Sequence, residues 1–145
     1  NDGLHGPKEK CGKRYLRRGN HRVITWGFQR GGGAYQTVYY KGPDTRYRKI
    51  LLNGDGAHYR PKKVRGFKMR VWKGVRGMHR IPSNYRRYRL LGTKYVDYIE
   101  LFNNKDFTNM IRKTPHDNFV WEFTGKVRIH RSGRYTMCTK SDDGS

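Results

Sequence analysis

The feature that most restricts the fold of this chain is the shortness of its apolar segments, which alternate with polar residues and end at turn formers. Alternation with a period of two is typical of half-buried strands, and Gly, Pro, Asp and Asn between such segments form turns. The sequence therefore predicts an all-β fold, an antiparallel β-sandwich or barrel. The predicted strands are residues 22–28, 35–40, 47–52, 67–72, 126–129 and 134–139.

Two local signals refine this prediction. The sequence HRSG at residues 130–133 lies between two predicted strands and indicates a hairpin, closed by Gly133 at a positive φ. Residues 104–113 are the one helix candidate, because Phe107 and two further apolar residues fall at i, i+3 and i+4. This helix would have one or two turns, which is too short to organise a domain.

The charge of the chain limits its partners. Lys and Arg number 33 against 11 Asp and Glu, which gives a formal net charge of +22. Such a field attracts polyanions, among them nucleic acid, sulfated or carboxylated polysaccharides and acidic protein surfaces. Alternatively, the charge belongs to a solvated surface that is neutralised inside a larger assembly. The basic residues are scattered and match no basic helical arm, zinc module or aromatic RNA-binding signature, so the partner is not identified.

Patterns that would indicate catalysis or membrane insertion are missing from the sequence. It contains no Gly-x-Ser-x-Gly, His-Glu-x-x-His or phosphate-loop motif, so we expect a protein without enzymatic activity and without a cofactor. No apolar stretch approaches the roughly 18 residues of a membrane span, so we expect no membrane insertion.

The C-terminal part of the sequence carries a family resemblance. Residues 120–145 combine an aromatic-Gly strand (Trp121, Gly125), an alternating strand, Gly-x-Tyr-Thr and then Ser-Asp-Asp-Gly-Ser. This order resembles the first half of the anthrax protective antigen barrel family, and residues 66–101 look like its opening strands. That family is a β-sandwich module of cell-surface adhesins, flocculation lectins, glycosidase insertions and tandem-repeat extracellular proteins. The resemblance implies an extracellular or cell-surface location.

The N-terminal part resembles the second half of the same module. The matching segments are residues 1–12 (NDGLHGPKEKCG), 19–34 (GNHRVITWGFQRGGGA) and 39–45 (YYKGPDT). The halves therefore occur in reverse order. In the family pattern one short strand of roughly ten residues would separate SDDGS from NDGLHG, so we expect both ends of the sequence to fall inside a domain.

Two arrangements explain the reversed order. In a tandem array, residues 1–56 are the C-terminal half of one module, residues 57–65 a linker, and residues 66–145 the N-terminal half of the next module. Each half would then be completed by an adjacent repeat or another copy. Alternatively, the chain is one circularly permuted module, which proteins tolerate when the termini lie close together.

The two cysteines, Cys11 and Cys138, distinguish these arrangements. They are too few for a zinc site without histidine help, and in a surface protein they favour disulfides, with buried free thiols as the alternative. The permuted order brings them close enough in sequence to bridge neighbouring strands of one module. In the tandem order each would pair outside this chain. Cα atoms within about 7 Å of each other would show that both halves share one barrel.

The resemblance also supplies candidate site residues. In the lectin branch of the family, an Asp-Asp pair joined by a cis peptide holds Ca²⁺, which orients sugar hydroxyls. Asp142 and Asp143 are therefore candidate calcium and carbohydrate ligands, with Asp2 near the same edge and Trp26 and Tyr35 as stacking platforms. Ca²⁺ takes six to eight oxygen ligands, so we expect it only in a complete module. Here we expect a turn in which the Asp side chains bind backbone N–H groups.

Two functions fit these observations. The first is a non-enzymatic extracellular module of a tandem-repeat protein that binds carbohydrate, or that builds a fibre or matrix through contacts with other copies. The second is a basic protein docked on a polyanion, either nucleic acid or acidic protein, in a large complex.

Overall fold

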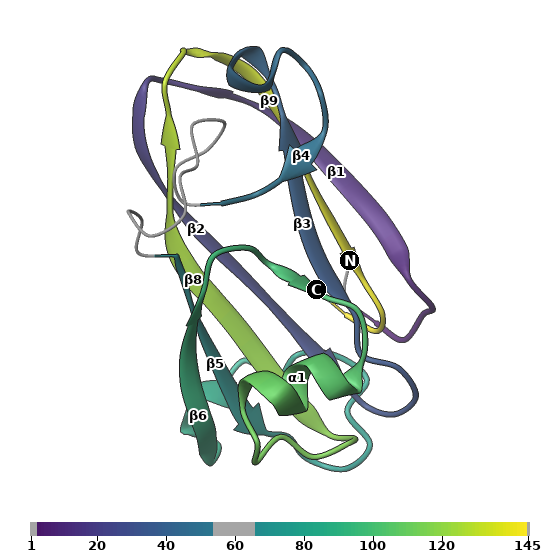
Figure 1. Cartoon of the computed structure of the whole chain (residues 1–145). Coiled ribbons are helices and arrows are strands. Elements are labelled where there is room, and N and C mark those ends of the chain that lie inside the picture. The colour runs from purple at the N-terminus through teal and green to yellow at the C-terminus, as the bar shows by residue number, and fades with distance from the viewer. Residues whose placement is uncertain (1–2, 54–65, 145) are drawn as a thin grey trace.

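The computed structural model describes residues 3–53 and 66–144, which form two antiparallel sheets packed face to face (Figure 1). One sheet, the β1 sheet, has the order β1-β9-β3-β4, and β7 also pairs with β3. The other, the β2 sheet, has the order β2-β8-β5-β6. The predicted all-β antiparallel sandwich is confirmed. The strands are β1 (Lys8–Leu16), β2 (Gly19–Gln29), β3 (Gln36–Lys41), β4 (Ile50–Leu51), β5 (Phe67–Lys73), β6 (Leu90–Val96), β7 (Glu100–Leu101), β8 (Phe119–Ile129) and β9 (Gly133–Ser141).

The main core lies between the sheets and is rich in aromatic side chains. On β8 the alternate residues Phe119, Trp121 and Phe123 are fully buried, as the period of a half-buried strand requires. The short helix α1 (Asn104–Met110) adds Phe107, whose ring centroid lies 4.7 Å from that of Trp121. The predicted helix of one or two turns is therefore confirmed. Asn103 caps it by accepting a hydrogen bond from the backbone N–H of Asp106.

A second, smaller core lies on the outer face of the β2 sheet. Residues 74–89, which include the short 3-10 helix η3 (Tyr85–Arg87), connect β5 to β6 and supply Met78 and Tyr85 to this cluster. These two side chains pack with Phe28, Trp72 and Val120 of the sheet. The segment thus covers one end of the outer face, while Arg22, Lys126 and Arg128 toward the other end are exposed.

The predicted hairpin between β8 and β9 is wrong, because these strands belong to different sheets. Val127 and Ile129 of β8 and Tyr135 of β9 all bury their side chains in the one core, so they face each other across the sandwich. Residues 130–133 cross between the sheets instead of closing a hairpin. Gly133 is also not among the residues with a positive φ. It permits a close approach, because a Cβ there would lie 2.6 Å from Cγ of Pro43.

Both halves of the sequence contribute to both sheets. In the β1 sheet, β1 and β3 pair with β9, and in the other sheet β2 pairs with β8. Cys11 lies directly opposite Cys138, and a disulfide joins them with their Cα atoms 4.0 Å apart. This structure therefore differs from the tandem expectation, because each half buries its inner face against the other half. The predicted linker at residues 57–65 lies outside the described residues.

The helices of the described residues are short. None is long and apolar enough to span a membrane.

Candidate polyanion-binding face

The open part of the outer face of the β2 sheet carries a group of cations. Residues directly opposite each other in an antiparallel pair point to the same side of the sheet. Arg22 lies opposite Lys126, and Asn20 lies opposite Arg128. On the neighbouring strand, Lys68 lies opposite Thr124 and Arg70 opposite Glu122. We call the following residues the basic face: Arg22, Lys68, Arg70, Lys126 and Arg128.

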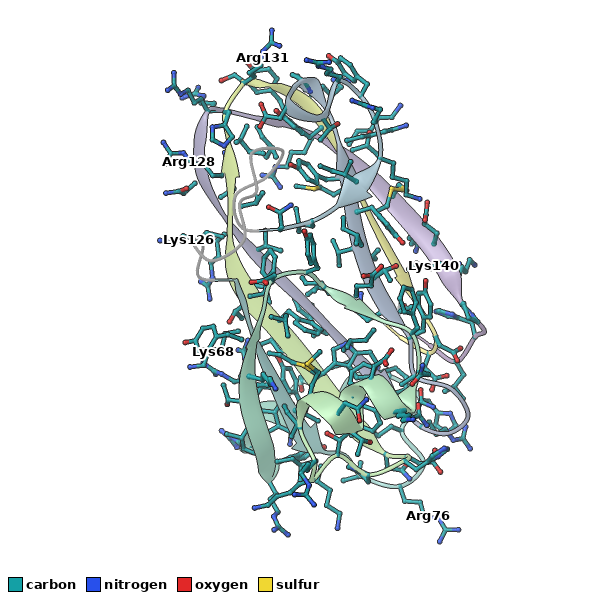
Figure 2. All side chains as sticks on the ribbon, in the orientation of Figure 1. Lys68, Arg76, Lys126, Arg128, Arg131 and Lys140 are labelled. Carbon is teal, nitrogen blue, oxygen red and sulfur yellow. A yellow bond between two sulfur atoms is a disulfide. The ribbon has the colours of Figure 1, made fainter. Side chains whose placement is uncertain are left out.

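The register fixes the spacing of these cations. Lys126 and Arg128 are two residues apart on β8, and Arg22 lies on the adjacent strand opposite Lys126. Same-face neighbours along a strand are about 6.6 Å apart, and neighbouring strands about 4.8 Å apart. Figure 2 shows Lys68, Lys126 and Arg128 on one side of the sandwich, directed away from the core. An extended ligand with regularly spaced anionic groups can therefore contact several of these side chains at once.

Two exposed aromatic side chains lie among the cations. Trp26, which is 43% exposed, occupies the row of Arg70, because both lie opposite Glu122 on β8. Tyr95, which is 61% exposed, lies directly opposite Lys68. The face thus combines positive charge with flat apolar surfaces on which a ring can stack.

The carboxylate of Glu122, which lies between Trp26 and Arg70 on this face, is covered. Glu122 is 1% exposed, accepts a hydrogen bond of 2.5 Å from the Tyr85 hydroxyl, and forms an ion pair with Arg86. Burial alone would raise the pKa of Glu122, but the hydrogen bonds from Tyr85 and Arg86 outweigh it and hold that pKa below its usual range. Burial, and then the bond to Glu122, raises the pKa of Tyr85 to about 12. Glu122 therefore stays ionised and attaches residues 74–89 to the sheet, and its carboxylate is not exposed among the cations of the basic face.

The aspartate pair at the end of the chain forms a tight turn. Asp143 is buried at φ 53°, and its Oδ2 accepts a 3.0 Å hydrogen bond from the backbone N–H of Arg30. Asp142 Oδ1 accepts one of 3.2 Å from the backbone N–H of Asp143. Burial and the neighbouring Asp143 charge raise the pKa of Asp142. As expected, these carboxylates bind backbone N–H groups, and no cis peptide occurs in the described residues.

The other predicted site residues lie in different places. Tyr35 lies beside the aspartate turn, since its carbonyl accepts a hydrogen bond from the N–H of Asp142, and its ring lies 5.3 Å from Nζ of Lys140. Trp26 belongs to the basic face instead. Asp2 lies outside the described residues. The structure therefore brings Tyr35, but not the side chain of Trp26, into the immediate surroundings of the aspartate turn.

Among the described residues, no group of metal-ligating side chains gathers at this turn. Within residues 3–53 and 66–144, one group of three His, Cys, Asp or Glu side chains comes close enough to share an ion, and it consists of Glu9, Cys11 and Cys138. Both cysteines are bonded to each other, so their thiolates are not available as metal ligands. The predicted disulfide is confirmed, and it occupies this position.

Sequence reasoning missed the basic face, although a signal for it exists. The segments at residues 68–70 (KMR) and 126–128 (KVR) both place cations on either side of an apolar residue within a predicted strand. That pattern directs the two cations to the same outer face. What the sequence does not show is that the two strands are neighbours.

No protein-family model matches the sequence, and no curated protein and no solved structure shows significant similarity to it. The function is therefore argued from the arrangement of the side chains.

Proposed function

We propose that this chain is a non-enzymatic, extracellular carbohydrate-binding module whose ligand is a sulfated or carboxylated polysaccharide. The observation that carries the proposal is the basic face, where five cations and two exposed aromatic side chains adjoin and the carboxylate of Glu122 is buried. The cations attract the anionic groups of the polysaccharide, and Trp26 and Tyr95 offer surfaces on which its sugar rings can stack. The disulfide supports an oxidising compartment, which is typical of extracellular proteins.

The arrangement favours a polymer over a small anion. A single sulfate or carboxylate reaches one or two of the cations, whereas an extended chain can contact Arg22, Lys126 and Arg128 together. Each exposed contact contributes little, about 0.2–1 kcal/mol, so useful affinity requires several of them. Binding should therefore strengthen with the length of the polysaccharide and weaken with salt.

The family resemblance stays part of this proposal. Two observations favour a single module with permuted halves over a tandem window: both sequence halves build each sheet, and the N–H of Asp143 donates a 2.9 Å hydrogen bond to the carbonyl of His5. This hydrogen bond joins the SDDG turn (residues 141–144) to residues 3–6, as the permuted order implies.

The test is a binding comparison among dextran sulfate, polygalacturonate and neutral dextran of equal length, at about 50 and 200 mM salt. We expect the two anionic chains to bind, more weakly at the higher salt concentration, and neutral dextran not to bind. R22S/K126S/R128S should weaken binding about tenfold or more. The matched variant K105S/R112S/K113S removes the same charge near α1, and its affinity should change less than about threefold. Equal losses in both variants would contradict the proposed site.

The net charge of +22 and the aromatic side chains on the basic face also suit single-stranded nucleic acid. An oligonucleotide of matched charge therefore joins the comparison. Tighter binding of the oligonucleotide than of dextran sulfate would favour the nucleic-acid alternative over the polysaccharide. Calcium-dependent binding of neutral sugars, abolished by a chelator, would instead place the site at Asp142 and Asp143.

A further inference from the structure

We propose that the outer face of the β1 sheet is a second polyanion-binding face, so that one sandwich links two polysaccharide chains. This inference rests on the proposed function and adds a second site on the opposite side of the molecule. It makes the module a cross-linker of anionic chains.

The second face is built by three adjacent strands. Thr136 of β9 lies opposite Lys13 of β1 on one side and opposite Lys41 of β3 on the other. Two residues earlier on β9, Arg134 lies opposite Tyr15, which is 62% exposed. These positions alternate with core residues of β9, so they point outward. Lys13 and Lys41 lie roughly 10 Å apart, which is two strand spacings.

Within the described part of the chain, the cations at this end of the face have no acidic partner. All three cationic residues, Lys13, Lys41 and Arg134, are exposed, and none forms an ion pair with an acidic side chain of the described residues. At the other end, Glu9 forms a 2.6 Å ion pair with Lys49. The uncompensated charge of the β1 sheet is therefore concentrated at the Lys13, Lys41 and Arg134 end, and an anionic chain would lie there.

The fold keeps the two faces apart and holds the second one in place. The sheets share one core between them, so their outer faces point in opposite directions, separated by at least about 10 Å. In Figure 2, Lys140 of β9 and Lys126 of β8 lie on opposite sides of the sandwich. The disulfide joins β1 to β9 next to the cations, which fixes their spacing before a ligand binds. Each face can thus bind a separate polysaccharide chain.

A two-step capture experiment tests the inference. Dextran sulfate is fixed to a surface, protein shown to be monomeric by sedimentation is bound and washed, and fluorescent dextran sulfate is then added. We expect the wild-type protein to capture the second chain. K13S/K41S/R134S should still bind the surface but capture at least about fivefold less fluorescent chain. K105S/R112S/K113S, with the same loss of charge near α1, should capture as the wild type does.

The outcomes separate this inference from the proposed function. If the wild-type protein does not bind the first chain, the proposed function fails. If it binds the first chain but captures no second one, the basic face acts alone or one chain wraps both faces, and the inference is wrong. Equal capture by wild type and K13S/K41S/R134S would also overturn it. Circular dichroism checks that each variant is folded. If the triple variant is unfolded, the single variants K13S, K41S and R134S replace it, and each should capture about twofold less fluorescent dextran sulfate than the wild type.

Discussion

Removing the Cys11–Cys138 disulfide should cost several kcal/mol of stability, although the strand that it holds buries little. The two cysteines are 127 residues apart in sequence, and eight of the nine residues of β1 are exposed. The effect must therefore come mainly from the unfolded chain, which the bond restricts. For a loop of this length the chain-entropy estimate is about 5 kcal/mol at 25 °C, and measured losses are typically about 2–5 kcal/mol. We expect a loss of about 3–5 kcal/mol.

Urea unfolding of C11S/C138A, followed by tryptophan fluorescence, measures this loss. The urea dependence of the unfolding free energy should become steeper, because an unfolded chain without the cross-link exposes more surface. The wild-type protein in reducing agent should match the variant within about 1 kcal/mol. Hydrogen exchange should show faster exchange of the β1 amides. A loss below about 1 kcal/mol with an unchanged slope would refute the argument that the bond acts by restricting the unfolded chain.

Three further predictions concern the packing and the turns. Glu122→Gln should lower the unfolding free energy by about 1–3 kcal/mol at pH 7. The pKa of Glu122 is lowered in the folded state. Its contribution to the free energy of unfolding is therefore fully present above about pH 4.3 and is lost as the pH falls through the folded-state pKa. The Glu122→Gln variant should lack this dependence on acid. Gly125→Ala places a Cβ 2.5 Å from Phe67 and should cost about 1–3 kcal/mol in urea unfolding, whereas Gly12→Ala, with nothing within 4 Å, should change stability by less than about 0.5 kcal/mol. Asp143→Ala should cost about 1–2 kcal/mol and Asp143→Asn less, with or without calcium; a calcium-dependent loss in thermal unfolding would contradict the turn role.

The strands that could be predicted from the sequence are those with one buried side. Residues 22–28, 67–72 and 126–129 lie within β2, β5 and β8. The inner positions of β5 and β8 are apolar, whereas the alternating apolar residues of β2, Ile24, Trp26 and Phe28, lie on its outer face. The charged strand β1 was missed, since it is an edge strand whose residues stay in solvent. Of the predicted strand at residues 47–52, only Ile50–Leu51 pairs, because Tyr47 adopts a positive φ and residues 46–49 are exposed.

The candidate site could be predicted only in part. The cations at residues 68–70 and 126–128 alternate with core residues, so their outward direction follows from the sequence. That the two strands are neighbours does not follow from the sequence, because the pairing of β5 with β8 joins segments far apart in the chain. The expected hairpin wrongly placed β8 beside β9. Glu122 could not be recognised as covered, since its partners Tyr85 and Arg86 come from a long connection without alternation.

The pairing pattern of the two sheets sets the order in which the domain can fold during synthesis. None of β1, β2 and β3 pairs with another of these three. In the described residues β1 pairs with β9 and β2 with β8, while β3 pairs with β9 and, over two residues each, with β4 and β7. At about 5–20 residues per second, the ribosome takes roughly 4–16 s to reach β8 after completing β3. During that time β1 and β2 lack the strands with which they pair, and Cys11 has no partner thiol. Closure of both sheets and oxidation of the cysteines are therefore late events in the biogenesis of this domain.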